Sequence, residues 1–181
     1  GYIGKRQASP ILLDGLRRLE YRGYDSAGMA LMGGGEEMRT IKRAGRIENL
    51  RQAVNEISPR GDVGISHTRW ATHGAPTDAN AHPHADQSGK LALVHNGVIE
   101  NYQSLRDQLI IQGETFNSET DTEVLSHLVG RYFDKSTEPD GEQRLIHAVK
   151  TAIAKVKGTY GIAVMHQDVP GVIVGARLGS P

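Results

Sequence analysis

The stretch that decides the fold is Asp62 to Gly97, DVGISHTRWATHGAPTDANAHPHADQSGKLALVHNG. It opens with a strand-like run at 62–67, closes with another at 91–95, and holds a histidine-rich polar loop between them. A loop dense in His, Arg, Thr and Asn is costly to bury, so binding or chemistry is the usual reason for one in the middle of a globular chain. The pattern therefore predicts a candidate functional site carried by strand ends.

On either side of this stretch, pairs of predicted strands alternate with pairs of predicted helices. Ser9-Pro10, read as an N-cap and first helical residue, begins a helix with a leucine stripe that ends near Gly23. Further helices are predicted at 47–57, at 102–112 with Asn101 as its cap, along the stripe Leu125, Leu128, Val129 and Tyr132, and after Gly141, with strands at 27–32, 38–44, 161–165 and 172–176. The strand-helix-strand alternation of a parallel sheet is missing, which predicts an α+β layered sandwich with mostly antiparallel strands.

Composition places the chain among ordinary globular proteins. Its 181 residues, 38% of them hydrophobic, suffice for one domain with a real core. Lys plus Arg and Asp plus Glu are equal at 21 each, so no overall field favours nucleic acid or an anionic membrane as a partner. No apolar run approaches the roughly 20 residues of a membrane span, and we expect a cytoplasmic location. The sequence contains no cysteine, which excludes disulfides and thiolate metal sites.

The Asn96-Gly97 pair admits two interpretations. Directly after an apolar strand, an amide side chain beside an unobstructed glycine N–H suits an oxyanion hole. Asn-Gly is also the commonest tight-turn dipeptide, and taken alone the pair favours the turn.

The run from Arg69 to Gly74 offers a guanidinium fork for a carboxylate, with hydroxyl and imidazole donors nearby. A buried structural arginine beside a core tryptophan explains the run equally well. The acidic run from Ser118 to Glu123 is explained most simply by capping of the next helix. One of its acids is nevertheless in a position to turn inward and hold an ammonium group.

The histidines suggest a metal site at first sight. His82 and His84, with His67, His73 and His95, supply enough imidazoles for one. Metal sites in hydrolases usually recruit carboxylates or closely spaced helical ligands, and the nearby acids Asp78 and Asp86 lie in flexible surroundings. We therefore expect no metal and no cofactor.

Five motifs in this order resemble the glutaminase domain of the glucosamine-6-phosphate synthase family, also called glutamine:fructose-6-phosphate aminotransferases (isomerizing). They are YRGYDSAG at 21–28, HTRWATHG at 67–74, NAHPH at 80–84, HNG at 95–97 and SETDTEV at 118–124. The resemblance implies an N-terminal-nucleophile hydrolase fold, a four-layer α/β/β/α sandwich. It also implies hydrolysis of L-glutamine, with the ammonia passed to separate isomerase domains that convert fructose 6-phosphate to glucosamine 6-phosphate. Other amidotransferases of the same fold and a nucleophile-free glutamine-binding module are the alternatives.

The resemblance also assigns roles to individual residues. Arg69 matches the residue that binds the substrate α-carboxylate, and Asp121 the one that binds the α-ammonium group. Asn96 and Gly97 match the oxyanion hole, which favours that interpretation over the turn. Trp70 matches a mobile residue that shields the site and gates ammonia, and the remaining matched pocket positions are Thr72, His73, Arg22, Gly23 and His82.

One departure from the family pattern concerns the nucleophile. The family uses an N-terminal cysteine whose own α-amino group, with a pKa near ~8, serves as the base. Because this sequence has no cysteine, we expect residues to be missing ahead of Gly1, and final strands and the isomerase domains to be missing after Pro181. The expected domain at 1–181 is thus a glutaminase domain incomplete at both ends and inactive alone. Complete family members generally form homo-oligomers through their isomerase domains.

Overall fold

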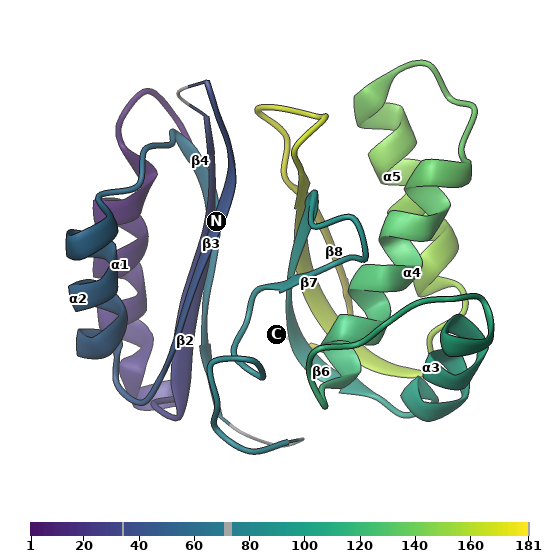
Figure 1. The fold of residues 1–181 in the computed structure, drawn as a ribbon, viewed down its shortest axis with the longest axis horizontal. Helices are drawn as coiled ribbons and strands as arrows, with labels where there is room; N and C mark the ends of the chain where they lie inside the picture. The colour runs from purple at the N-terminus through teal and green to yellow at the C-terminus, as the bar shows by residue number, and fades with distance from the viewer. Residues whose placement is uncertain (34, 71–73, 181) are drawn as a thin grey trace. The chain divides into compact units, whose positions relative to one another are not determined.

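The structure, a computed structural model, describes residues 1–33, 35–70 and 74–180, apart from the side chains of Arg22 and Glu36. Two compact units divide the chain, Gly1–Pro83 and His84–Pro181. Each unit is a four-stranded antiparallel sheet with helices packed on one face (Figure 1). The predicted α+β class with antiparallel strands is confirmed within each unit, and the single domain at 1–181 stays a prediction.

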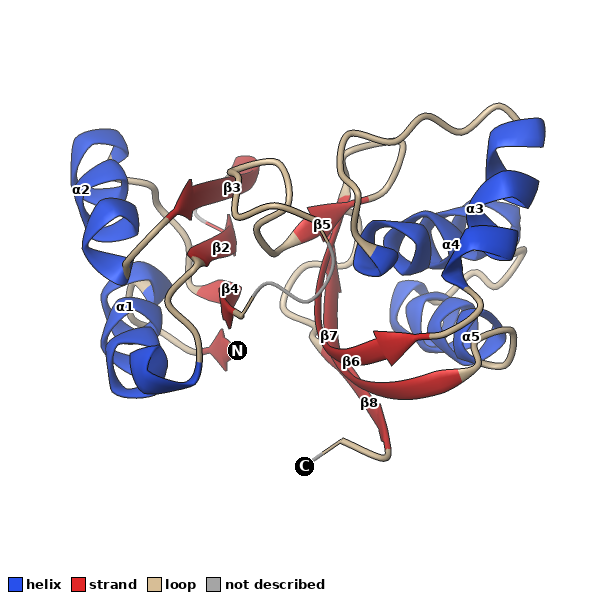
Figure 2. Ribbon diagram, turned by 90° about the horizontal axis from the view of Figure 1, so that it is seen from below, coloured by secondary structure: helices blue, strands red, loops and turns tan. Residues whose placement is uncertain are grey.

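The first unit has its sheet in the order β1-β4-β2-β3, with α1 and α2 on one face (Figure 2). Its elements are β1 Tyr2–Ile3, α1 Ala8–Leu19, the 3₁₀ helix η1 Glu20–Arg22, β2 Ser26–Gly33, β3 Glu36–Ala44, α2 Ile47–Ile57 and β4 Val63–Arg69. Alternate residues of β2, namely Ala27, Met29 and Leu31, belong to the apolar core with α1 and α2. Because strand side chains alternate between faces, Ser26 and Arg69, which are opposite one another in β2 and β4, lie on the face away from these helices.

The second unit has its sheet in the order β5-β6-β7-β8, with α3, α4 and α5 packed against one face. Its elements are β5 His84–Ala85, β6 Leu91–Ile99, α3 Tyr102–Ile111, α4 Asp121–Lys135, α5 Gly141–Ile153, β7 Gly158–His166 and β8 Val174–Leu178. α4 is the central helix of this layer, and eleven of its fifteen residues are buried. In this unit the sequence prediction missed β5, a strand of two residues that is too short to show a period.

The start of α1 differs from the prediction. Ser9 is not the N-cap; the helix begins at Ala8, and Gln7 precedes it. The turn forms early because the Ala8 N–H donates to the carbonyl of Gly61 at 2.8 Å, while the Gly61 N–H donates to the side chain of Gln7 at 3.1 Å. Pro10 still lies in the first turn, where backbone N–H groups have no acceptor within the helix.

The expected cap at Asn101 is correct in position but wrong in mechanism. Asn101 precedes α3, yet its side chain makes no capping hydrogen bond. Its amide instead donates to the Lys155 carbonyl at 2.9 Å and accepts from the Lys157 N–H at 2.8 Å. The side chain thus fastens the start of α3 to the segment before β7.

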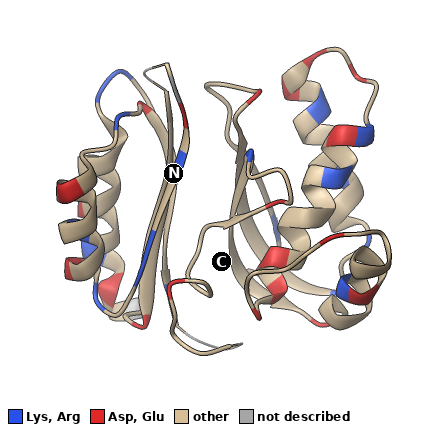
Figure 3. Cartoon of the chain, viewed as in Figure 1, with Lys and Arg blue, Asp and Glu red and all other residues tan. Residues whose placement is uncertain are grey.

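Charge is spread over both units. Lys and Arg are interspersed with Asp and Glu on the helices of each (Figure 3), as expected from equal totals of 21. Among the helices of the described residues, none has the length and apolar content that crossing a bilayer requires.

Two buried histidines predict a pH dependence of stability. Burial is the main cause that lowers the pKa of His95, against the pull of Asp121, and of His166, against the pull of Asp168. Their ordinary pKa of 6.5 applies in the unfolded chain, which therefore binds more protons below that pH than the folded protein does. Stability is thus fully present above 6.5 and falls as the pH drops, by up to about 1.4 kcal/mol per pH unit for each ring.

Urea unfolding between pH 7.5 and 5.5 measures this slope. H166N removes one of the two rings and is expected to reduce the slope. H147N removes an exposed ring from α5 and is the matched control for the loss of an imidazole as such. A free energy of unfolding that is constant over this range in the unmodified protein contradicts the prediction.

Candidate active site

The Asn96-Gly97 pair lies inside a strand. Residues 91–95 of β6 are buried, whereas Asn96, Gly97 and Val98 are exposed. β7 pairs with β6 along its whole length, with Asn96 opposite Gly161 and Gly97 opposite Tyr160. The chain does not reverse here, so the tight-turn interpretation is wrong.

Gly97 is a position that other residues do not fit. Its φ is +137°, outside the range that L side chains favour, and a Cβ added there would lie 2.1 Å from the carbonyl oxygen of Thr159 on β7. The absence of a side chain therefore allows β7 to approach the backbone at this point. It also leaves the Gly97 N–H unobstructed by a side chain of its own.

Asp121, the first residue of α4, is buried, with 6% of its surface exposed. Its Oδ2 accepts a hydrogen bond from the Ile99 N–H at 2.9 Å, two residues beyond Gly97. One acid of the 118–123 run does turn inward, as the sequence allowed. The structure thus joins the carboxylate of Asp121 to the same strand that carries Asn96 and Gly97.

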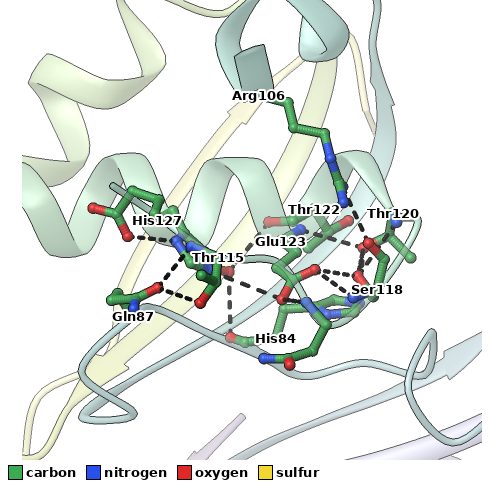
Figure 4. Close-up of polar contacts among 12 residues, drawn as sticks. His84, Gln87, Arg106, Thr115, Ser118, Thr120, Thr122, Glu123 and His127 are labelled. Carbon is green, nitrogen blue, oxygen red and sulfur yellow. Dashed lines mark hydrogen bonds and ion pairs between the residues drawn. The ribbon is translucent and has the colours of Figure 1, made fainter. Parts of the chain in front are cut away.

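The capping interpretation of this run is confirmed as well (Figure 4). Thr120 is the N-cap of α4, and its Oγ1 accepts from the Glu123 N–H at 3.3 Å. The Glu123 carboxylate reaches back and accepts from the N–H groups of Asn117 at 2.8 Å and Ser118 at 2.7 Å. The N–H of Thr120 itself donates to Ser118 Oγ at 3.3 Å, so Glu123 holds the residues before the N-cap and not the N-cap N–H, as it would in a capping box. Glu123 therefore fixes the loop that ends at Asp121.

Further side chains support this network (Figure 4). The Nε2 of His84 lies 3.1 Å from Thr120 Oγ1, and Ser126 Oγ donates to the His84 carbonyl at 3.2 Å. His127 Nδ1 bonds Glu114 at 2.8 Å on the other side of α4. These imidazoles hold α4 against β5 and the 112–120 loop.

Arg69 ends β4 and is buried, with 4% exposed. Its guanidinium donates to the carbonyls of Gly74 at 3.3 Å and Ala75 at 3.4 Å, and the Asn80 amide shares the latter at 3.0 Å. Trp70 is 57% exposed and makes an edge-to-face contact with Tyr24 at 5.4 Å. The interpretation of Trp70 as a core tryptophan is therefore wrong.

The remaining predicted positions of the first unit fall around this strand end. A Cβ at Gly23 would lie 2.8 Å from the carbonyl carbon of Arg69, so glycine is needed where η1 meets β4. His82 Nδ1 lies 2.9 Å from the Nδ1 of His67, another β4 residue. Arg22 is in η1, and its side chain lies outside the described part, as do Thr72 and His73.

The structure thus forms two groups from the predicted residues. Asn96, Gly97 and Asp121 belong to the second unit, and Gly23, Arg69, Trp70 and His82 to the first. The histidines that suggested a metal site also belong to both units, with 67, 73 and 82 in the first and 84 and 95 in the second. In the part of the chain that the structure describes, no group of three or more His, Asp or Glu side chains has the arrangement of a metal site.

Two residues near Asn96 were not predicted as part of the site. His95, buried at 3% exposure, has its Nδ1 3.1 Å from Thr122 Oγ1 and its Nε2 3.3 Å from the Thr159 carbonyl. The sequence offered a signal, because an imidazole at the end of an apolar strand needs polar partners. Thr122 carried no such signal, since it stands among five other polar residues.

Comparison with known proteins shows which proteins the chain resembles. Residues 52–139 match the glutamine amidotransferase domain family. Over all 181 residues the chain is 51% identical to the glutamine–fructose-6-phosphate aminotransferases (isomerizing) of Symbiobacterium thermophilum and Clostridium tetani. A glutamine amidotransferase domain is thus present in this chain. The chain spans 28% of the length of each of those two relatives. The resemblance drawn from the five motifs is confirmed.

Two solved structures support the fold. The glutamine phosphoribosylpyrophosphate amidotransferase of B. subtilis matches with a TM-score of 0.77 and 30% identity, over 97% of this chain and 36% of that one. A structure described as the allosteric regulatory enzyme of purine biosynthesis matches with a TM-score of 0.72 and 32% identity, over 87% of this chain and 33% of that one. The predicted α+β fold class of the N-terminal-nucleophile hydrolase type is confirmed.

Proposed function

We propose that this chain is the glutamine-hydrolysing part of a glutamine:fructose-6-phosphate aminotransferase. It converts L-glutamine to glutamate and supplies ammonia for glucosamine 6-phosphate synthesis. The observation that carries the proposal is the sequence identity. It is 51% over all 181 residues to a relative of that name, and 30% to the phosphoribosylpyrophosphate amidotransferase. Its partner in this proposal is a sugar-phosphate isomerase part of the same polypeptide, assembled as a homo-oligomer in the cytoplasm.

The proposed chemistry assigns one task to each group. The Asn96 amide and the Gly97 N–H donate to the oxygen of the tetrahedral intermediate, where negative charge develops. Asp121 binds the α-ammonium group of glutamine, and Arg69 binds its α-carboxylate through a two-pronged guanidinium contact. The exposure of Asn96 and Gly97 beside the buried Asp121 supports these roles.

A thiolate nucleophile has to come from outside these 181 residues, because they include no cysteine. The register of the first sheet indicates where such a residue would lie. β1 runs antiparallel to β4, with Tyr2 opposite Gly64. If residues before Gly1 continued β1 in the same register, the fourth residue before Gly1 would lie opposite Arg69. A nucleophile at that position would lie beside Arg69, the residue proposed to bind the α-carboxylate of glutamine.

The test is the fate of the glutamine amide nitrogen. We expect the protein, produced as its gene encodes it, to transfer ¹⁵N from [amide-¹⁵N]glutamine to fructose 6-phosphate. Mass spectrometry then detects labelled glucosamine 6-phosphate, and no labelled phosphoribosylamine when phosphoribosyl pyrophosphate is the acceptor.

The 181-residue chain alone serves as the control and should release ammonia no faster than buffer with glutamine. Labelled phosphoribosylamine from the gene product would overturn the proposal in favour of the other amidotransferase. If the full gene product binds glutamine without hydrolysing it, the result supports the alternative of a glutamine-binding module.

A further inference from the structure

We propose that Thr122 and His95 are positioning residues for the Asn96-Gly97 pair. This assignment rests on the proposed function of that pair in glutamine hydrolysis. The two side chains form a hydrogen-bonded connection from the start of α4, through β6, to β7. The His95 ring and the Thr159 carbonyl at the end of this connection both lie next to Gly97.

The first two residues of α4 hold β6 on both sides of the pair. Before it, Thr122 Oγ1 lies 3.1 Å from the Nδ1 of His95. After it, Asp121 Oδ2 accepts the Ile99 N–H at 2.9 Å. Only the exposed segment 96–98 lies between these two attachments. The helix start therefore fixes the strand at both ends of the segment that presents the oxyanion donors.

The partners of His95 determine which ring nitrogen carries the proton. The carbonyl of Thr159 only accepts hydrogen bonds, so Nε2, 3.3 Å away, is the protonated nitrogen. In a neutral imidazole Nδ1 is then an acceptor. The Thr122 hydroxyl has one proton and lies 3.1 Å from Nδ1 and 3.4 Å from Asp121 Oδ1, so it donates to Nδ1, the nearer acceptor. The connection thus has one direction, from the Thr122 hydroxyl through the ring to the Thr159 carbonyl.

This connection ends on Gly97 itself. The same Thr159 carbonyl oxygen lies against the Cα of Gly97, where an added Cβ would be 2.1 Å from it. That Cβ would also be 3.0 Å from Nε2 of His95. The His95 imidazole and the Thr159 carbonyl, which are hydrogen-bonded to each other, therefore both pack against the Gly97 backbone. Displacing the ring therefore shifts the Gly97 N–H relative to the position of the developing oxyanion.

The test removes the Thr122 hydroxyl in the protein as its gene encodes it. Without that donor, the buried Nδ1 of His95 is left without its threonine partner and the ring is no longer held in one orientation. T122V, which keeps the shape of the side chain, is expected to lower kcat for glutamine hydrolysis about tenfold. KM for glutamine should change less than kcat, because Asp121 keeps its 2.9 Å bond from the Ile99 N–H and loses only the 3.4 Å contact with Thr122 Oγ1.

Rescue and a matched control separate positioning from a general structural effect. T122S restores the hydroxyl and should recover kcat to within about threefold of the unmodified protein. T115V removes a threonine hydroxyl that bonds Gln87 on the surface and should leave kcat unchanged. If T122V does not fold, T122A and T122S make the same comparison.

Each outcome decides the proposal. A folded T122V protein with kcat within twofold of the unmodified protein overturns it, and so does a T122S protein that is as slow as T122V or T122A. The N96A variant keeps the two proposals apart. If N96A lowers kcat and T122V does not, only the positioning role fails; if N96A has no effect, the proposed oxyanion role fails first.

Discussion

The N96A protein is expected to hydrolyse glutamine about 10²–10³ times more slowly than the unmodified protein, because one of two oxyanion donors is lost. The effect should fall on kcat, since the donor acts where charge develops in the transition state. The folded state should change little. Asn96 is exposed, and the pairing of β6 with β7 uses backbone groups that alanine keeps. Glutamate production measures kcat, and a thermal melt measures stability.

Val98 supplies the matched control. It lies two residues along the same strand, so its side chain projects from the same face of the sheet as Asn96, and it too is exposed. V98A should retain kcat within about twofold. An N96A protein that keeps more than about a tenth of the kcat contradicts the oxyanion role.

Asn96 also shows what can and cannot be predicted from neighbouring residues alone. As a dipeptide, Asn96-Gly97 favours a turn, because turn preference depends on the two residues alone. The structure keeps it in β6 because β7, some sixty residues later in the chain, pairs with it residue by residue. Only the family resemblance, which draws on motifs far apart in the chain, favoured the oxyanion hole.

Elements with a strong period were predictable. The helix expected at 47–57 is α2, Ile47–Ile57, and its buried residues follow the apolar stripe. The ends of helices were less predictable, because they depend on residues far away in the chain. The start of α1, for example, is set by Gly61 and not by Ser9. In the 118–124 run, the spacing of Thr120 and Glu123 is that of a capping box and was readable. Of the other two acids in the run, Glu119 is exposed and Asp121 is buried.

The second large effect is expected at Arg69. A guanidinium binds a carboxylate through two parallel hydrogen bonds, which a lysine ammonium does not reproduce. Losing a hydrogen bond to a charged group costs about 1.5–3 kcal/mol, which corresponds to about a 10–100-fold weaker interaction. In R69K we therefore expect KM for glutamine to rise by about that factor while kcat falls less. Steady-state kinetics in the protein as its gene encodes it measure both.

Arg69 also donates to the carbonyls of Gly74 and Ala75, so the measurement has to separate binding of substrate from support of the chain. A substrate without the α-carboxylate, 4-aminobutanamide, achieves this. If Arg69 binds that carboxylate, R69K should raise KM for glutamine but leave the kinetics with 4-aminobutanamide nearly unchanged. R43K alters a surface arginine of β3 that bonds a neighbouring carbonyl, and should affect neither substrate. An equal loss with both substrates would assign Arg69 to holding the 74–75 backbone rather than to glutamine.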